Sequence, residues 1–208
     1  MLSEIARLLA KSKRPLFHVG QGIRHAEKEF FGLMDYLQIP FVTARNANDM
    51  CAWDHPLLVG RPGTFAQRGA NFSVQTCDLY IAVGTRLSIT QTGYNTKDYA
   101  RNAQIIQVNI DRAELDKGTL RDPLNICMDA REFLLELNGC WKYFAGLSWP
   151  EWLAQCQKWK EKYPVCLAEY KEQKEYVNSY YFIETLSELA TAEDIIVTDM
   201  GFAFQNTH

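Results

Sequence analysis

The chain has 208 residues, enough for one substantial hydrophobic core with a segment left over. Its apolar fraction of 47% and charged fraction of 23% are typical of a folded globular protein and exclude a disordered or coiled-coil chain. A formal net charge of -3, with basic and acidic residues interspersed, provides no basic field to attract nucleic acid or an anionic membrane.

The sequence shows no pattern typical of a membrane span, a signal peptide, a zinc site or a disulfide framework. The longest apolar runs, such as 79–84, fall far short of the roughly 18 residues of a spanning helix, and the first ten residues carry Glu4 and read as an amphipathic surface helix. The six cysteines show no Cys-x-x-Cys and no paired histidine spacing, so neither a zinc site nor a disulfide framework is indicated. We therefore expect a cytoplasmic protein with no membrane and no nucleic acid as partner.

The first part of the chain alternates strand and helix patterns. Residues 14–20 form a short apolar run that ends in glycine, and a helix with one apolar face follows at Ala26, Phe30, Leu33 and Leu37. Residues 39–44 read as the next strand. Thr64 is placed to cap a helix through Val74 whose small residues permit close packing.

The strongest strand pattern covers residues 77–84, and a loop from 85 to about 102 follows it. Residues 104–111 are rich in β-branched side chains and fit a strand covered on both faces, and a short strand near Ile126 precedes a helix over 130–137. Strands that alternate with helices across short turns form right-handed βαβ units. The predicted fold class is α/β, an open parallel sheet with helices on both faces.

The composition divides the chain into three parts. Residues 1–140 form the predicted sheet domain, which is nucleotide-binding-like, and residues 141–180 carry tryptophans and no strand pattern, as in a helical linker. These aromatics either pack the linker onto a domain or stack on nucleic acid bases, and the missing basic groove disfavours the second reading. From residue 181 a helix and then a strand over 194–199 open a new βα unit.

Candidate ligand-binding residues follow four of the predicted strands, because ligands collect at the carboxyl ends of parallel strands. They are Gly20 and Gly22, Gly60 and Gly63, Gly84 and Arg86, and Asn109 and Asp111. Each has an ordinary structural alternative: a tight turn for the first pair, a surface turn for the second, a surface salt bridge for Arg86 and helix capping for the last.

No catalytic constellation can be read from the spacing. His18 lies within a strand, where a packing role is expected, whereas His25 and His55 lie in turn-like stretches. No serine or cysteine occupies a nucleophile elbow, and no acid–base pair can be nominated.

The ordered set of motifs resembles a known family. It comprises Arg14-Pro-Leu-Phe-His-Val-Gly-Gln-Gly-Ile23, Pro40-Phe-Val-Thr43, Gly60-x-x-Gly63, Ala70-Asn71, Cys77-Asp-Leu-Tyr-Ile-Ala-Val-Gly-Thr-Arg86 and Ile106-Gln-Val-Asn-Ile-Asp111. Over residues 2–137 the chain resembles the central domain of thiamine-diphosphate-dependent enzymes of the acetolactate synthase type. The tail 194–201 resembles the start of that family's third domain, where the cofactor diphosphate is held, so Gly201 is a further candidate.

The resemblance implies a Rossmann-like central domain in which some members hold FAD along the strand ends. By match of position the flavin contacts are Gly20, Gly22, Thr43, Gly60, Gly63, Gly84, Thr85, Arg86, Val108, Asn109 and Asp129. The synthases typically follow Gly-x-Arg with two acidic residues and another arginine, whereas this chain has Ser88, Ile89 and Thr90. FAD, another ADP-like group and an empty scaffold therefore remain alternatives.

For the parent protein the resemblance implies a carboligase or decarboxylase of a 2-keto acid such as pyruvate, with thiamine diphosphate and magnesium, as a homodimer or homotetramer with its other domains. The catalytic glutamate and the Gly-Asp-Gly…Asn magnesium motif of the family are not in this sequence, so we expect these residues alone to be inactive. A NAD-dependent deacylase would need paired Cys-x-x-Cys motifs and is disfavoured. A pure interaction module stays an alternative.

Overall fold

The computed structural model describes residues 1–191, 193–199 and 201. The chain divides into two compact units, Met1–Lys162 and Tyr163–His208. Within the described part of the chain, no helix is both long enough and apolar enough to cross a membrane.

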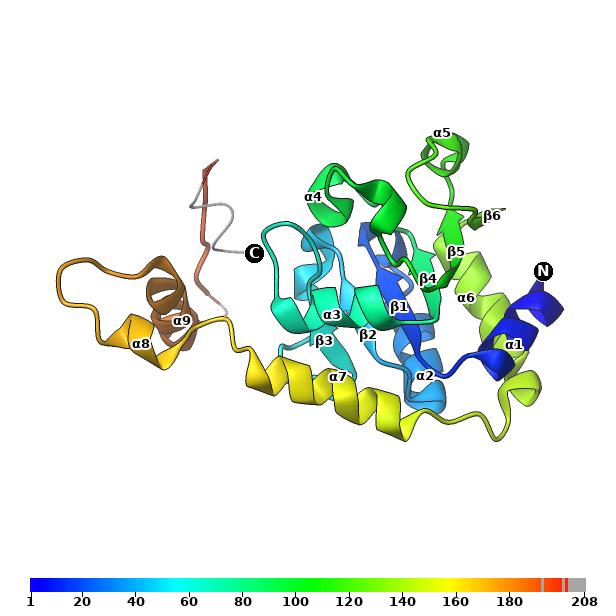
Figure 1. Cartoon of the computed structure of the whole chain (residues 1–208), viewed down its shortest axis with the longest axis horizontal. Coiled ribbons are helices and arrows are strands. Elements are labelled where there is room, and N and C mark those ends of the chain that lie inside the picture. The colour runs from blue at the N-terminus through cyan, green and yellow to red at the C-terminus, as the bar shows by residue number, and fades with distance from the viewer. Residues whose placement is uncertain (192, 200, 202–208) are drawn as a thin grey trace. The chain divides into compact units, whose positions relative to one another are not determined.

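The first unit is built on a six-stranded parallel sheet in the order β3-β2-β1-β4-β5-β6 (Figure 1). The strands are β1 Pro15–Val19, β2 Phe41–Thr43, β3 Leu58–Gly60, β4 Leu79–Val83, β5 Gln104–Asn109 and β6 Leu124–Cys127. Every residue of β1 and β4 is buried, as expected for central parallel strands covered on both faces. The predicted α/β class and open parallel sheet are confirmed.

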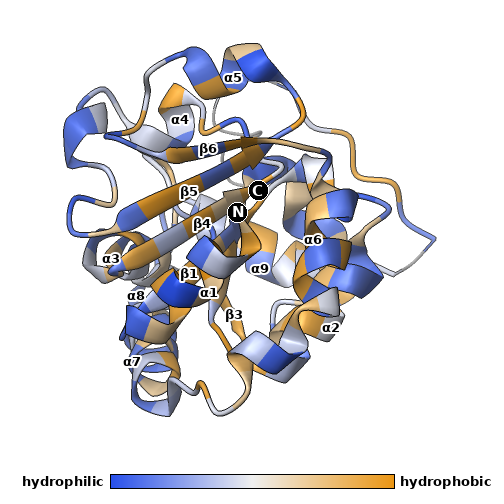
Figure 2. Ribbon diagram, turned by 90° about the vertical axis from the view of Figure 1, so that its right-hand side faces the viewer, coloured by the Kyte–Doolittle hydropathy of each residue, from blue (hydrophilic) through white to orange (hydrophobic). Residues whose placement is uncertain are grey.

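Helices cover both faces of the sheet. They are α1 Leu2–Lys11, α2 Glu27–Leu37, α3 Arg68–Thr76, α4 Ile89–Thr92, α5 Arg112–Asp116, α6 Ala130–Gly139 and α7 Pro150–Lys162, with short 3-10 turns η1 Gln21–Ile23, η2 Arg45–Met50, η3 Thr96–Asp98 and η4 Trp141–Phe144. Figure 2 shows α2 and α6 on one side of the sheet and α3 and α7 on the other. Phe17 of β1 meets Phe30 of α2 edge to face, which seals the α2 side of the core.

Some details of the first unit differ from the sequence expectations. The short strand β3 was not predicted; its three residues Leu58–Gly60 lie between two prolines and within a turn-rich stretch, whereas β2 lies within a longer apolar run. The helix expected to begin at Thr64 begins at Arg68, since Thr64 donates its hydroxyl to the Thr90 carbonyl instead of capping a helix. Gln67 fixes the preceding turn by accepting from the backbone N–H of Arg61 at 2.7 Å.

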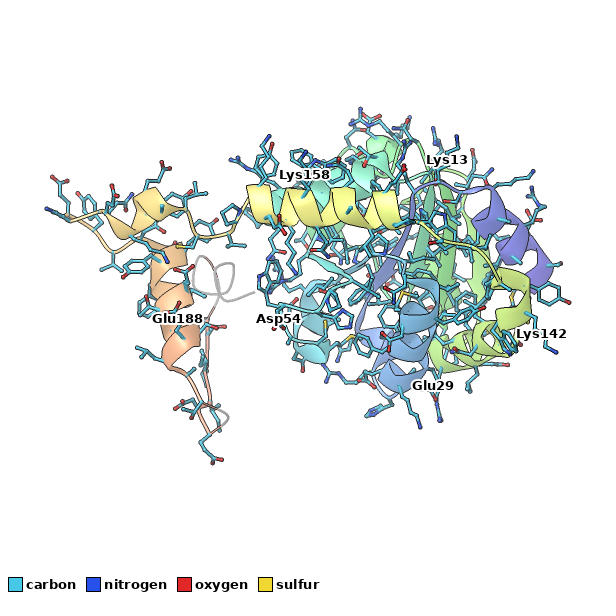
Figure 3. All side chains as sticks on the ribbon, turned by 90° about the horizontal axis from the view of Figure 1, so that it is seen from below. Lys13, Glu29, Asp54, Lys142, Lys158 and Glu188 are labelled. Carbon is cyan, nitrogen blue, oxygen red and sulfur yellow. The ribbon has the colours of Figure 1, made fainter. Side chains whose placement is uncertain are left out.

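Helix α7 belongs to the first unit and crosses it, with the exposed Lys158 on its surface (Figure 3). The indole N–H of Trp149 donates to the Ser12 carbonyl and that of Trp152 to the Pro15 carbonyl, both at 2.8 Å. These bonds fasten α7 to the amino end of β1. A Cβ on Gly69 of α3 would lie 3.1 Å from the backbone of α7, so the two helices approach closely there.

The second unit contains α8 Ala168–Lys171 and α9 Ser179–Leu189, and the Asn178 side chain caps α9 by accepting from Tyr180. The strand expected over 194–199 is not formed. A strand requires a hydrogen-bonded neighbour, and within the described residues no strand pairs with this stretch, whose Ile195 and Val197 are exposed. Most of what should follow it, Met200 and 202–208, lies outside the described residues.

Candidate functional site

The strand order reverses direction between β1 and β4, and this switch point lies at the carboxyl edge of the sheet. The strand ends align there, with Val19 opposite both Thr43 and Val83, and Val83 opposite Val108. In open parallel sheets of this strand order, nucleotides bind in the crevice at such a point. The helices α4 and α5 lie beyond the same end of the sheet (Figure 1).

Glycines from β1 and β4 interlock at the switch point. The Gly22 N–H donates to the Gly84 carbonyl at 2.9 Å, and the Gly20 N–H donates to the Val83 carbonyl at 3.1 Å. A Cβ on Gly22 would lie 2.6 Å from the Gly84 Cα, a distance at which backbone must move. Gly84 also has φ of +59°, in the left-handed region. The contact between the two loops therefore accounts for these three glycines without a ligand.

The Gly60 to Gly63 turn is joined to the loop after β4. Asn71 of α3 accepts from the Gly63 N–H and donates to the Gly63 carbonyl, each at 2.9 Å. The Thr64 N–H donates to the Thr90 carbonyl at 2.8 Å. Gly60, at the end of β3, has φ of +138°, so a side chain there would be strained. The carboxyl edge is thus a set of mutually bonded loops.

Arg86 leaves the end of β4 and forms an ion pair. Its Nε and Nη2 atoms both lie 2.7 Å from Glu114 Oε1 of α5, while its side chain remains 80% exposed. The Lys117 ammonium donates to Glu114 Oε2 at 2.7 Å and to the Arg86 carbonyl. The bond from Lys117, supported by Arg86, holds the pKa of Glu114 below its usual value. The salt bridge and an exposed guanidinium coexist here.

The predicted polar residues at the ends of β5 and β6 make structural bonds. Asn109 donates to the Thr85 carbonyl at 3.3 Å and accepts from the Asp111 N–H at 2.9 Å. Asp111 caps α5 by accepting from the Ala113 N–H. Asp129 caps α6 by accepting from the two N–H groups of Arg131 and Glu132. These side chains shape the edge through the ends of the helices.

Three of the remaining candidates are buried residues of the first unit, and one lies in the second unit. Thr43 ends β2 and is buried, as is Thr85. The Val108 side chain is wholly buried, and its carbonyl accepts from the Gly84 N–H at 3.0 Å. Gly201 lies in the second unit with φ of +80°. The structure therefore gathers the first-unit candidates along one edge, with Val108 offering only its backbone.

Sequence reasoning missed a buried polar chain beneath this edge. His18 of β1 is fully buried, as expected of a packing residue, and its Nδ1 bonds to the Tyr80 hydroxyl, which lies 2.9 Å from the Tyr99 hydroxyl. Gln91 of α4 approaches His18 Nε2 at 3.2 Å. Burial lowers the pKa of His18 to about 3, so the imidazole stays neutral.

The amide of Gln91 sets the direction of this chain. Its oxygen accepts from the Ser88 N–H at 3.3 Å, so its nitrogen donates to His18 Nε2 and His18 donates through Nδ1. The bond from Gln91 to His18 therefore attaches the loop after β4 to the sheet. The signal in the sequence was a histidine and a tyrosine in neighbouring strands; the register sets His18 opposite Ala82 and Tyr80 opposite Leu16, so the two are diagonal neighbours on one face.

The side chains that could hold a metal ion or an anionic cofactor differ in how closely they gather. Along the described residues, no three His, Cys, Asp or Glu side chains gather as a metal-binding group. At the carboxyl edge, Arg86 is exposed beside the switch point and Lys117 adds a second cation, and both pair with Glu114.

Comparison with known proteins identifies the fold. Residues 2–137 match the model of the thiamine pyrophosphate enzyme central domain. The chain belongs to that family. The match ends within α6, and it includes every strand of the sheet and each of the loops at its carboxyl edge.

Similar proteins within this family are acetolactate synthases. The chain is 32% identical to an acetolactate synthase large subunit of Cyanidium caldarium over 80% of its own length and 29% of the relative's. It is 35% identical to a probable large subunit of Methanocaldococcus jannaschii, over 65% of this chain and 23% of that protein. It is 30% identical to acetolactate synthase 1, chloroplastic, of Zea mays, over 97% and 31%. The chain thus spans less than a third of the length of these curated relatives.

Proposed function

We propose that this chain supplies the central domain of an acetolactate synthase-like enzyme that acts on 2-keto acids, and that the carboxyl edge of its sheet binds the ADP part of FAD or a similar ADP-like group. Membership of the thiamine pyrophosphate enzyme family supports the parent class. Thiamine diphosphate, when bound in the parent with magnesium, supplies the carbanion chemistry. A homodimer or homotetramer and the start of a diphosphate-binding domain after residue 180 belong to the same proposal.

One observation supports nucleotide binding most strongly: Arg86 stands exposed directly after β4, at the topological switch point of the sheet. A guanidinium there can give a phosphate a charge-assisted, two-pronged hydrogen bond. The loops on either side of it are held by bonds between Gly22 and Gly84 and between His18 and Gln91. A ligand would meet an edge whose backbone is already fixed.

Titration calorimetry of the whole chain with ADP and with FAD tests this function. Arg86→Ala should weaken binding by roughly ten- to a hundredfold, the value of one charge-assisted hydrogen bond. The free energy of unfolding of this variant should change by at most about 1 kcal/mol, because the Arg86 side chain is 80% exposed and Glu114 keeps Lys117 as its partner. Arg112→Ala is the matched control, since Arg112 is an exposed arginine of α5 that pairs with Asp116. Binding of neither nucleotide, or equal losses in both variants, would contradict the proposal.

The alternative is a scaffold without a ligand. It is favoured by the glycine contacts and by the capping bonds of Asp111 and Asp129, because each explains a predicted ligand residue structurally. The same calorimetry distinguishes the two functions, since a scaffold binds neither ADP nor FAD.

A further inference from the structure

A carboxylate lies between the two cations at the carboxyl edge. Glu114 gives one oxygen to Arg86 and the other to Lys117, and only 12% of its side chain is exposed. Arg86 follows β4 and Glu114 follows β5, so the ion pair links the loops of neighbouring strands. The carboxylate is thus a fixed part of the edge rather than a freely moving surface charge.

This carboxylate acts on the guanidinium in two ways. It orients Arg86, because two nitrogens of the guanidinium bond to one oxygen, and this reduces the rotamer freedom that a ligand would otherwise have to remove. It also lowers the positive potential of the cluster, which carries two cations and one anion. The cluster therefore attracts a phosphate with a net charge of +1, although it contains two cations.

We propose that Glu114 is a specificity-determining residue that competes with anionic ligands for Arg86 and Lys117 and so limits the affinity of the edge for phosphate groups. This inference rests on the proposed nucleotide function. The competing charge lowers the affinity for every anionic ligand, and most for ligands with several negative charges such as a diphosphate, because repulsion from a fixed carboxylate grows with the charge of the ligand. Glutamine at position 114 can accept the same hydrogen bond from Arg86 but carries no charge. Glu114→Gln therefore separates the orientation of the guanidinium from the competition with anionic ligands.

The test compares Glu114→Gln with Asp116→Asn by calorimetry on the whole chain. Asp116 lies on the same short helix and pairs with Arg112 at 2.9 Å, so its neutralisation changes the net charge equally without touching Arg86. Glu114→Gln should tighten binding of both ADP and inorganic pyrophosphate about two- to fivefold, the value of one charge contact made by a solvent-exposed guanidinium, and should steepen the salt dependence. Asp116→Asn should leave both affinities near those of the wild type.

The outcomes separate this inference from the function on which it rests. If the wild type binds no ADP but Glu114→Gln binds pyrophosphate more tightly than wild type and Asp116→Asn, the carboxylate competes and the nucleotide function fails. If the wild type binds ADP and Glu114→Gln does not change the affinity, or changes it as much as Asp116→Asn does, the competition is refuted and the function stands. A weaker Glu114→Gln variant that keeps its wild-type thermal unfolding would also refute competition, because orientation would then dominate.

Discussion

Lowering the pH from 7 to 5 should destabilise the first unit through His18. The folded state holds this imidazole neutral, because burial lowers its pKa from the usual 6.5 to about 3. In the unfolded state the group takes up a proton near pH 6.5, so the unfolded chain binds more protons as the pH falls. The stability that the neutral histidine contributes is present above pH 6.5 and is lost progressively between 6.5 and about 3.

The magnitude follows from this difference. At pH 5 the unfolded pKa lies about 1.5 units above the solution pH, and each unit is worth about 1.4 kcal/mol, so His18 should remove about 2 kcal/mol of the free energy of unfolding. Urea unfolding followed by circular dichroism at pH 7 and pH 5 measures the loss. In His18→Gln the loss between the two pH values should be about 2 kcal/mol smaller. The half-buried His55, whose pKa burial also lowers, is present in both proteins and cancels in the comparison.

Tyr99→Phe is the matched control. It removes one hydroxyl from the same buried chain, 2.9 Å from the Tyr80 hydroxyl, and leaves the imidazole in place. Since burial raises the pKa of Tyr99 above its usual value, this residue does not titrate between pH 5 and 7. The variant should lose about 1–3 kcal/mol at both pH values and keep the wild-type pH dependence. An unchanged pH dependence in His18→Gln would refute a neutral buried His18.

Three further predictions concern the edge and the parent chemistry. Gly22→Ala should lower the free energy of unfolding in urea by about 1–3 kcal/mol, because its Cβ would meet Gly84. Gly32→Ala, which has nothing within 4 Å, should stabilise α2 by about 0.5–1 kcal/mol. Equal effects of the two substitutions would contradict the close contact between Gly22 and Gly84. Asp129→Ala should cost about 1 kcal/mol through its cap without changing ADP affinity, and a loss of affinity in calorimetry would give Asp129 a ligand role. The chain alone, with thiamine diphosphate, magnesium and pyruvate, should release no CO₂ above a no-protein control.

The elements predictable from sequence were those whose signal is local. The strands β1, β4 and β5 are largely apolar, because both of their faces are covered, and a glycine follows β1 and β4 at the carboxyl edge. The start of α3 was wrong, because Thr64 bonds to Thr90, 26 residues away. Such a contact leaves no periodic trace in the sequence.

In the candidate site too, local features could be predicted from the sequence and long-range contacts could not. Arg86 could be placed after its strand, but its partner Glu114 lies 28 residues further along the chain, and only the pairing of β4 with β5 brings the two together. The reason for Gly20 and Gly22 also needed the structure, since a glycine required by a neighbouring backbone and one required by a ligand look alike in sequence.

The tryptophan bonds of α7 have a practical consequence for dividing this chain. Trp149 and Trp152 are buried as well as bonded to the carbonyls of Ser12 and Pro15. Cutting the chain after the helix α6 would uncover the surface that these indoles shield and leave two backbone acceptors at the amino end of the central strand without their donors. A soluble, cooperatively folding recombinant domain should therefore extend through Lys162, and loss of α7 docking should shift the summed tryptophan emission, to which Trp149 and Trp152 contribute.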